Sequence, residues 1–188
     1  MLPYIFDSRH RKTQGGSITD FPTIKVYVSL GSNIGDTDEN LNEAVARLEK
    51  YEGIDPELWS ETYLTEPQGL KDQAWFTNQI VRFAVDPELW SPQGFLSTLQ
   101  AVEGQMQRVK KEINGPRIID LDLILFGDEV VDGGDYLTVP HSRAKDRAFV
   151  LCPLAEIDPK LVFPDGSNIA DLLSKIDYRI EDKKIYQN

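Results

Sequence analysis

The segment from Ile118 to Phe126, which reads IIDLDLILF, most constrains how this chain can fold. Its apolar residues alternate with two carboxylates, and successive side chains of a β-strand point to opposite faces of a sheet. The alternation therefore predicts a strand that turns Asp120 and Asp122 to one face. The apolar residues on the other face would be Ile119, Leu121, Leu123 and Leu125. On a helix the two carboxylates would diverge.

Two carboxylates fixed side by side raise each other's pKa unless a cation neutralises them. Hard divalent cations such as Mg²⁺ bind this kind of oxygen cluster, usually together with substrate phosphates. The alternative is a half-exposed strand with one solvated face, because Asp-x-Asp alone is a weak motif. Gly115-Pro116-Arg117 just before the strand favours the metal interpretation, since it sets a guanidinium near the carboxylates. A structural ion pair would give the same pattern.

The length of 188 residues predicts one domain with a core of its own. The net charge of −11 argues against a nucleic-acid partner held by a broad basic surface. No apolar run approaches the roughly 20 residues that span a bilayer, so no membrane partner is expected. The only cysteine, Cys152, excludes an intramolecular disulfide and favours a reducing compartment, here the cytoplasm.

The expected domain covers residues 23–188 and follows a flexible tail over residues 1–22. An organelle transit peptide is the alternative for this tail, although Asp7 and Asp20 count against it. Nothing of sufficient length is left for a fused partner domain, so the chain is either monofunctional or a piece excised from a larger protein.

The remaining pattern predicts a βαββαβ order. Beside the Asp strand, strands are expected over 24–30, 59–64 and 76–85, and helices over 37–50, from Ser91-Pro92 to Met106, over 145–151 and over 168–176. Asp36 and Ser91 have the chemistry of N-caps. This order is that of an α+β, ferredoxin-like sandwich, with an antiparallel sheet, helices on one face and C-terminal additions.

The polar motifs, in order, closely resemble those of the 6-hydroxymethyl-7,8-dihydropterin pyrophosphokinase family of folate biosynthesis. They are Gly31-Ser32-Asn33, Thr65-x-Pro67-x-Gly69, Glu103, Arg108, Gly115-Pro116-Arg117, Asp120-x-Asp122 and Pro140-His141. The resemblance runs from about residue 24 to about residue 176. It implies an enzyme that transfers pyrophosphate from ATP to the hydroxymethyl group of the pterin and releases AMP.

The resemblance also implies a role for individual residues. Asp120 and Asp122 match ligands of two Mg²⁺ ions, and Arg108 and Arg117 match catalytic arginines that close over the phosphates. The positions matched to ATP binding are Gln100, Glu103, Lys110, Thr138, His141 and Arg147. Those matched to pterin binding are Thr65, Phe76, Asn78 and Phe149. Lys110 and Asn114 stand where many members carry arginine and tryptophan, which puts the affinity of the 107–117 loop in question.

Other interpretations of these residues stay open from sequence. Gln100 and Glu103 fit a solvated helix flank, His141 fits a turn, and Phe76 and Phe149 fit a core. A non-catalytic pterin- or nucleotide-binding module that keeps the fold is the rival function. An unrelated ferredoxin-like regulatory domain would explain none of the polar residues.

Overall fold

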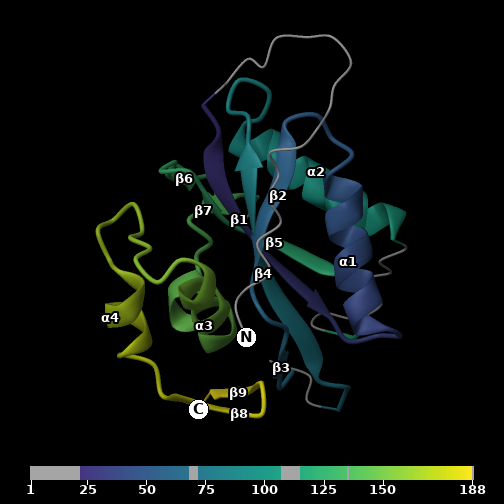
Figure 1. The fold of residues 1–188 in the computed structure, drawn as a ribbon, viewed down its shortest axis with the longest axis vertical. Coiled ribbons are helices and arrows are strands. Elements are labelled where there is room, and N and C mark those ends of the chain that lie inside the picture. Colours follow the sequence, from purple (N-terminus) through teal and green to yellow (C-terminus); the bar gives the residue numbers. More distant parts are fainter. Residues whose placement is uncertain (1–21, 68–71, 107–114, 135, 188) are drawn as a thin grey trace.

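The computed structural model describes residues 22–67, 72–106, 115–134 and 136–187. These residues form one mixed sheet with helices on both of its faces (Figure 1). Its strands are β1 (Ile24–Ser32), β2 (Ile54–Trp59), β3 (Tyr63–Thr65), β4 (Phe76–Val85), β5 (Asp120–Phe126), β8 (Tyr178–Glu181) and β9 (Lys184–Gln187). The helices are α1 (Thr37–Leu48), α2 (Pro92–Gln105), α3 (Ala148–Ile157) and α4 (Ile169–Leu173). A second, two-stranded sheet pairs β6 (Val131–Asp132) with β7 (Thr138–Val139).

The main sheet has the order β5-β1-β4-β3-β9-β8, and β2 also pairs with β4. Strand β1 therefore lies between β4 and β5, and it is antiparallel to both. Up to β5 the observed order is βαβββαβ, which matches the predicted βαββαβ order except that two strands, β2 and β3, replace the single strand predicted between α1 and β4. The expectation of an antiparallel sheet is wrong at one seam, because β9 runs parallel to β3. The sheet is mixed because the chain returns to it after α4.

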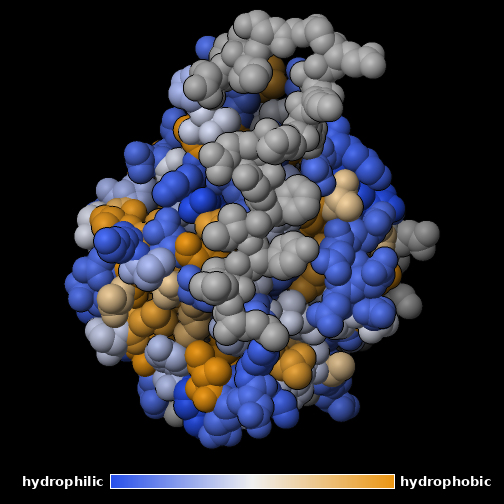
Figure 2. Space-filling model, viewed as in Figure 1, coloured by the Kyte–Doolittle hydropathy of each residue, from blue (hydrophilic) through white to orange (hydrophobic). Residues whose placement is uncertain are grey.

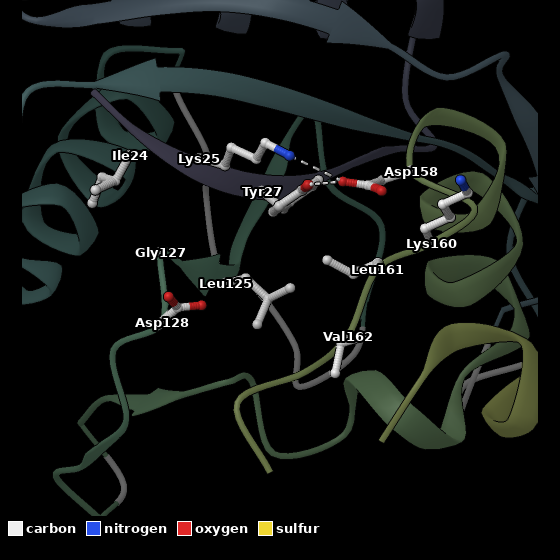
Figure 3. A pocket seen from close by; sticks show the side chains of 10 residues that line it. All are labelled: Ile24, Lys25, Tyr27, Leu125, Gly127, Asp128, Asp158, Lys160, Leu161 and Val162. Carbon is white, nitrogen blue, oxygen red and sulfur yellow. Dashed lines mark hydrogen bonds and ion pairs between the residues drawn. The ribbon is translucent and has the colours of Figure 1, made fainter. Parts of the chain in front are cut away.

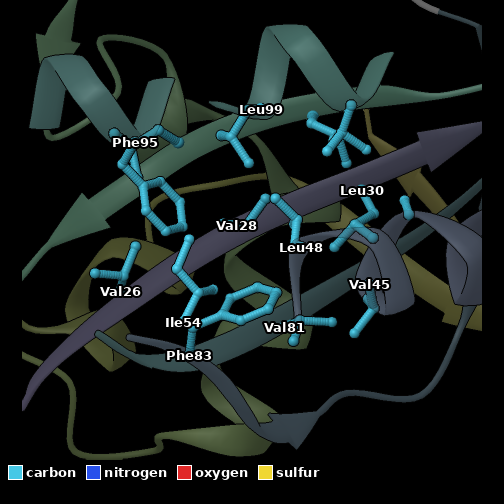
Figure 4. Close-up of a cluster of buried hydrophobic side chains, with 14 of the residues drawn as sticks. Val26, Val28, Leu30, Val45, Leu48, Ile54, Val81, Phe83, Phe95 and Leu99 are labelled. Atoms are coloured by element: carbon cyan, nitrogen blue, oxygen red, sulfur yellow. The ribbon is translucent and has the colours of Figure 1, made fainter. Parts of the chain in front are cut away.

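One face of the sheet packs against α1 and α2 (Figure 4). Val26, Val28 and Leu30 of β1 pack there against Leu48 and Leu99, and all five side chains are fully buried. The opposite face contributes Tyr27, Ile80 and Leu125 to a second cluster with Leu151 and Leu154 of α3. The prediction of helices on one face thus holds for α1 and α2 only, since α3 and α4 cover the other face.

Two helices begin where the sequence predicts. The carboxylate of Asp36 accepts a hydrogen bond from the Glu39 backbone N–H at 3.1 Å, which caps α1. The hydroxyl of Ser91 accepts from the Gly94 N–H at 3.2 Å, which caps α2. The expected helix over 145–151 is instead a 3₁₀ turn (Ala144–Asp146) followed by the longer α3.

The expected strand over 59–64 is wrong, because the chain forms two strands with a break at 60–62. Strand β2 begins at Ile54 and includes Pro56, where the register against β4 shifts. Proline has no N–H for a strand ladder, so a bulge is one of the few places in a sheet that tolerate it. A second bulge lies in β5, whose Leu125 pairs with Tyr27 while Leu123 pairs with Val28. Leu125 therefore faces α3, and its predicted place beside Leu121 and Leu123 is wrong.

Within the described ranges, no helix is long and apolar enough to cross a membrane. The described part of the face in Figure 2 mixes hydrophilic and hydrophobic residues. The large exposed apolar side chains are spread along the chain: Ile34, Leu64, Leu89, Val130, Tyr136, Val162 and Ile180.

Candidate active site

The two aspartates of β5 lie on the sheet face that α3 covers. Their side chains are 27% and 40% exposed, whereas Leu121 and Leu123 are buried against α1 and α2. The predicted alternation is confirmed at these four positions. Both carboxylates are therefore fixed side by side on a rigid strand, and both are open to a ligand.

Gly31 of β1 separates the carboxylates from the polar part of β4. It pairs with Asp120 on one side and with Asn78 on the other. A Cβ at Gly31 would lie 3.0 Å from Asn78 Oδ1 and 3.9 Å from the Asp120 Cβ. A side chain at this position would crowd the surface between the amide and the carboxylate. The glycine keeps that surface open for a ligand that contacts both.

The four residues predicted for a pterin site come from β3, β4 and α3. The amide of Asn78 donates a hydrogen bond of 2.6 Å to the Thr65 hydroxyl, and both side chains are buried. Phe76 and Phe149 are half-buried, the former on the same strand as Asn78 and the latter in the first turn of α3. Phe149 and Tyr63 of β3 both pack against the cluster of Ala148, Cys152 and Ile185, and Tyr63 pairs with Asn78. A buried amide, with one aromatic ring two residues away on its own strand and another on α3, suits a flat heterocycle with a donor and acceptor edge.

Each aspartate has an arginine partner. Arg117 Nη1 lies 2.7 Å from Asp120 Oδ2, and Arg147 Nη1 lies 3.9 Å from Asp122 Oδ2. Burial lowers the pKa of Arg147, as does the neighbouring Arg143, while the two aspartates oppose the shift. A guanidinium stays protonated despite such a shift. The same two guanidinium groups also stack on the rings of Phe76 and Phe149, at 5.6 and 5.3 Å.

His141 lies beside this cluster. Its backbone N–H donates to the Ile124 carbonyl at 3.0 Å, which fastens the turn to β5. Burial lowers the pKa of the imidazole, and the charges of Arg147 and Arg143 add to this effect against the opposing charge of Asp122. The N–H of Arg143 donates to His141 Nδ1 at 3.2 Å, so a neutral ring carries its proton on Nε2. That Nε2–H can donate a hydrogen bond to a phosphate oxygen.

Glu103 is 7% exposed, so the alternative of a solvated helix flank is wrong for this residue. Its Oε1 accepts a hydrogen bond of 2.8 Å from the Leu121 N–H, which lies between the two aspartates in the chain. Gln100, on the same helix, is exposed. The hydroxyl of Thr138 donates to the Gly134 carbonyl at 3.2 Å within its own hairpin. Arg108, Lys110 and Asn114 lie outside the described residues, as does nearly all of the tail expected over 1–22.

Asn33 has a larger part in the site than its place in a strand-to-helix turn indicated. Its side-chain oxygen accepts from the Arg117 N–H at 2.8 Å, and its amide nitrogen donates to Gln73 Oε1 and to the Ala74 carbonyl at 3.0 and 3.1 Å. Its own N–H also donates to the Arg117 carbonyl at 3.1 Å. Asn33 thus ties the segment that carries Arg117 to the segment that precedes Phe76. The sequence signal for this role was an asparagine directly after Gly31-Ser32. It did not indicate the partners of Asn33, because they lie 40 to 84 positions away in the chain.

Comparison with known proteins decides the family. The family described as 7,8-dihydro-6-hydroxymethylpterin-pyrophosphokinase (HPPK) matches residues 27–159. The chain belongs to the HPPK family. The 2-amino-4-hydroxy-6-hydroxymethyldihydropteridine pyrophosphokinase of Methylorubrum extorquens is 42% identical over 154 residues, which cover 81% of this chain and 94% of that protein. The protein of the same name from Pseudomonas aeruginosa is 39% identical over 150 residues, 80% of this chain and 90% of the relative.

Solved structures agree with the HPPK assignment at the level of the fold. The Plasmodium falciparum HPPK-DHPS chain crystallised with pteroate superposes with a TM-score of 0.63 at 13% identity. The match covers 88% of this chain and 47% of that one, so this chain spans about half of its length. The family predicted from the sequence motifs is therefore confirmed by sequence and by fold.

The donor set of this HPPK chain fits a hard divalent cation. Among the residues that the structure describes, no three His, Cys, Asp or Glu side chains gather around a common point. Mg²⁺ is commonly held by one or two carboxylates and completes its coordination with water and substrate phosphates. Asp120 and Asp122 supply such a pair, and nearby arginines would receive the phosphates. The carboxylates therefore fit the metal that the family motif implies.

A cavity of about 500 Å³ lies elsewhere, at the start of β1 and the end of β5 (Figure 3). Tyr27 and Lys25 line it, and both contact the carboxylate of Asp158, at 2.7 and 3.6 Å. Burial raises the pKa of the Tyr27 phenol, and the hydrogen bond to Asp158 adds to the shift. The five residue steps of β5 from Asp120 to Leu125 place this cavity roughly 17 Å along the strand from the aspartates. The cavity is thus separate from the candidate active site.

Proposed function

We propose that this chain transfers the pyrophosphoryl group of ATP to 6-hydroxymethyl-7,8-dihydropterin, giving the pterin diphosphate and AMP in folate biosynthesis. The observation that carries the proposal is the juxtaposition on one sheet face of two arginine-paired carboxylates and an aromatic, amide-bearing site, with Gly31 between them. One end of this surface suits a triphosphate and the other a flat heterocycle. The curated relatives named above have names that state this reaction type.

The reaction joins the hydroxymethyl oxygen to the β-phosphorus and breaks the bond from that phosphorus to the oxygen shared with the α-phosphorus. AMP leaves with this oxygen, and the hydroxyl proton is released. Such transfers depend on positioning and charge neutralisation more than on covalent catalysis. Arg117 and Arg147 are placed to hold phosphate oxygens, and His141 Nε2–H is placed to donate to another.

Asp120 and Asp122 would hold two Mg²⁺ ions, which when bound supply positive charge against the triphosphate. Arg117 would move from its ion pair with Asp120 to the phosphates as the carboxylate takes up a cation. Arg108 and Lys110 would join it from the 107–114 segment, as the family motif implies. Gln100, Glu103 and Thr138 belong to the nucleotide side in this proposal, with Glu103 acting through the backbone of β5.

At the other end, Phe76 and Phe149 would stack on the two faces of the pterin. Asn78 would read its polar edge, and Thr65 would fix the orientation of the amide through their 2.6 Å hydrogen bond. The family domain is proposed to cover residues 23–188, with ATP and the pterin as its partners and the reducing cytoplasm as its compartment. The buried free thiol of Cys152 is in keeping with that compartment.

The test is product analysis after incubation of the protein with ATP, Mg²⁺ and the reduced pterin. Equimolar AMP and pterin diphosphate are expected, and Asp122→Asn should lose them while keeping its fold. Asp128→Asn is the matched control, because Asp128 follows the same strand but lies at the distant cavity. ADP as the nucleotide product would contradict the proposal. ATP binding without consumption would support the rival function, a binding module.

A further inference from the structure

The C-terminal β8–β9 hairpin packs on the same sheet edge as the proposed pterin site (Figure 1). It lies beyond residues 27–159, which match the family. Strand β9 runs parallel to β3, and Ile185 pairs there with Thr65. The Leu64 N–H donates to the Lys183 carbonyl at 2.9 Å. The hairpin is thus the strand neighbour of a residue that orients Asn78.

The hairpin also contacts the residue before Phe76. The rings of Tyr186 and Trp75 meet edge to face, with centroids 5.4 Å apart. Arg179 stacks on Tyr186 at 4.1 Å, and the Lys184 ammonium lies 5.7 Å from the Trp75 ring centroid. Four side chains from the two segments therefore form one stack. This stack fixes the start of β4, where Phe76 leaves the 66–75 loop.

A third contact joins the hairpin to the first turn of α3. The side chain of Gln187 accepts a hydrogen bond from the Ala148 N–H at 2.8 Å and donates one to the Asp146 carbonyl at 2.6 Å. The residue at the N-cap position, Arg147, gives no side-chain cap, so Gln187 supplies the cap from the far end of the chain. Ile185 packs with Ala148 in the cluster that includes Phe149.

We infer that the β8–β9 hairpin braces the two aromatic walls of the pterin site, with Tyr186 and Gln187 as its positioning residues. The inference rests on the proposed function for its substrate. Its contacts reach Thr65, the approach to Phe76 and the helix turn of Phe149, which come from three segments far apart in sequence. A hairpin that merely added stability would affect both substrates alike. A brace of these walls acts mainly on the pterin.

The main test compares Tyr186→Ala with Ile180→Ala. Ile180 lies on the same hairpin but is 45% exposed, so its loss leaves the stack intact. Tyr186→Ala should raise the KM for the pterin roughly three- to tenfold, the range that one edge-to-face pair supports. The kcat and the KM for ATP should stay within about twofold of wild type, and Tyr186→Phe should restore the pterin KM. An unchanged pterin KM, or an equal rise in both KM values, would overturn the inference.

Two measurements that need no turnover separate this inference from the proposed function. Amide hydrogen exchange should accelerate at 63–65, 76–78 and 148–150 in Tyr186→Ala and stay unchanged in α1. Unchanged exchange at these segments would refute the brace, whether or not the wild-type protein produces AMP. Absence of AMP formation by the wild type would instead refute the proposed function. If Tyr186→Ala does not fold, Gln187→Ala takes its place in the exchange measurement, because it removes only the two hydrogen bonds of Gln187 at the start of α3.

Cys152 gives the second measurement. It is buried in the cluster with Ile185 and hydrogen-bonds to Tyr178 at the start of β8, so its alkylation reports undocking of the hairpin. Coupling between two sites is reciprocal. Saturating pterin should therefore slow Cys152 alkylation in the wild type, and it should slow it less in Tyr186→Ala. Equal alkylation rates with and without bound pterin would contradict the coupling.

Discussion

Replacement of Asn33 by alanine should uncouple the two segments that flank the active site. The substitution removes three hydrogen bonds, to the Arg117 N–H, to Gln73 and to the Ala74 carbonyl. At about 0.5–1.5 kcal/mol each, their loss should lower the free energy of unfolding by about 1.5–4.5 kcal/mol. For a domain of this size that is a fall in Tm of roughly 3–18 °C. Arg117, which is proposed to hold phosphate oxygens, would also lose its fixed place, and misplacement of a substrate-positioning group by about 1 Å can lower kcat a hundredfold.

Thermal unfolding and steady-state AMP formation, measured on the same preparation, test this prediction. Asn40→Ala is the matched control, because the Asn40 amide also makes two hydrogen bonds, at 3.1 and 2.8 Å, but only between α1 and the adjacent end of β1 and its turn. It should lower the Tm and leave kcat within about twofold of wild type. If Asn33→Ala kept the wild-type kcat, or if Asn40→Ala lost as much activity, Asn33 would have no positioning role.

Three further changes have distinct expected results. Glu103→Ala should lower the free energy of unfolding, measured in urea, by about 1–3 kcal/mol, because it leaves the buried Leu121 N–H without this acceptor. Glu103→Gln keeps an acceptor oxygen and should lose less than half of that free energy. Equal losses in the two variants would contradict the role of Glu103 as the acceptor for Leu121. Asp120→Ala should abolish AMP formation and change stability by less than about 1 kcal/mol, since its pair with Arg117 is partly solvated; a wild-type rate would rule out Asp120 as a metal ligand. Burial raises the pKa of the Cys152 thiol from 9.0 to about 11, so alkylation of native protein should stay slow until the pH approaches 11. The folded thiol ionises later than the unfolded one, so its contribution to stability is complete below pH 9.0 and is lost as the pH rises toward 11; fast alkylation of folded protein at pH 8 would contradict this.

Local signals in the sequence predicted the elements that local chemistry determines. The caps at Asp36 and Ser91 and the paired faces of Asp120 and Asp122 depend on residues within a few positions of one another, and all are present. The bulges at Pro56 and before Leu125 were not predictable in this way. Each depends on the register of a neighbouring strand from another part of the chain.

In the candidate site, too, the features carried by nearby residues were predictable and those that depend on distant parts of the chain were not. Residue types and motif order identified the family and pointed to the carboxylates and arginines as site candidates, because those features are carried by the chain itself. The buried bond from Glu103 to β5 and the three partners of Asn33 join residues 18 to 84 positions apart. The β8–β9 hairpin gave no motif at all, and its place beside β3 follows only from tertiary packing. Such contacts depend on the folded arrangement and leave little periodicity in the sequence.

The fate of the β-phosphorus tests the central claim most directly. The protein would be incubated with Mg²⁺, the reduced hydroxymethylpterin and ATP labelled at its β-phosphorus, and the products would be separated by chromatography. The account predicts that all transferred label appears in the pterin diphosphate while the AMP is unlabelled. Label retained in ADP beside a pterin monophosphate would show attack on the γ-phosphorus, and it would contradict the proposed pyrophosphoryl transfer at Asp120 and Asp122.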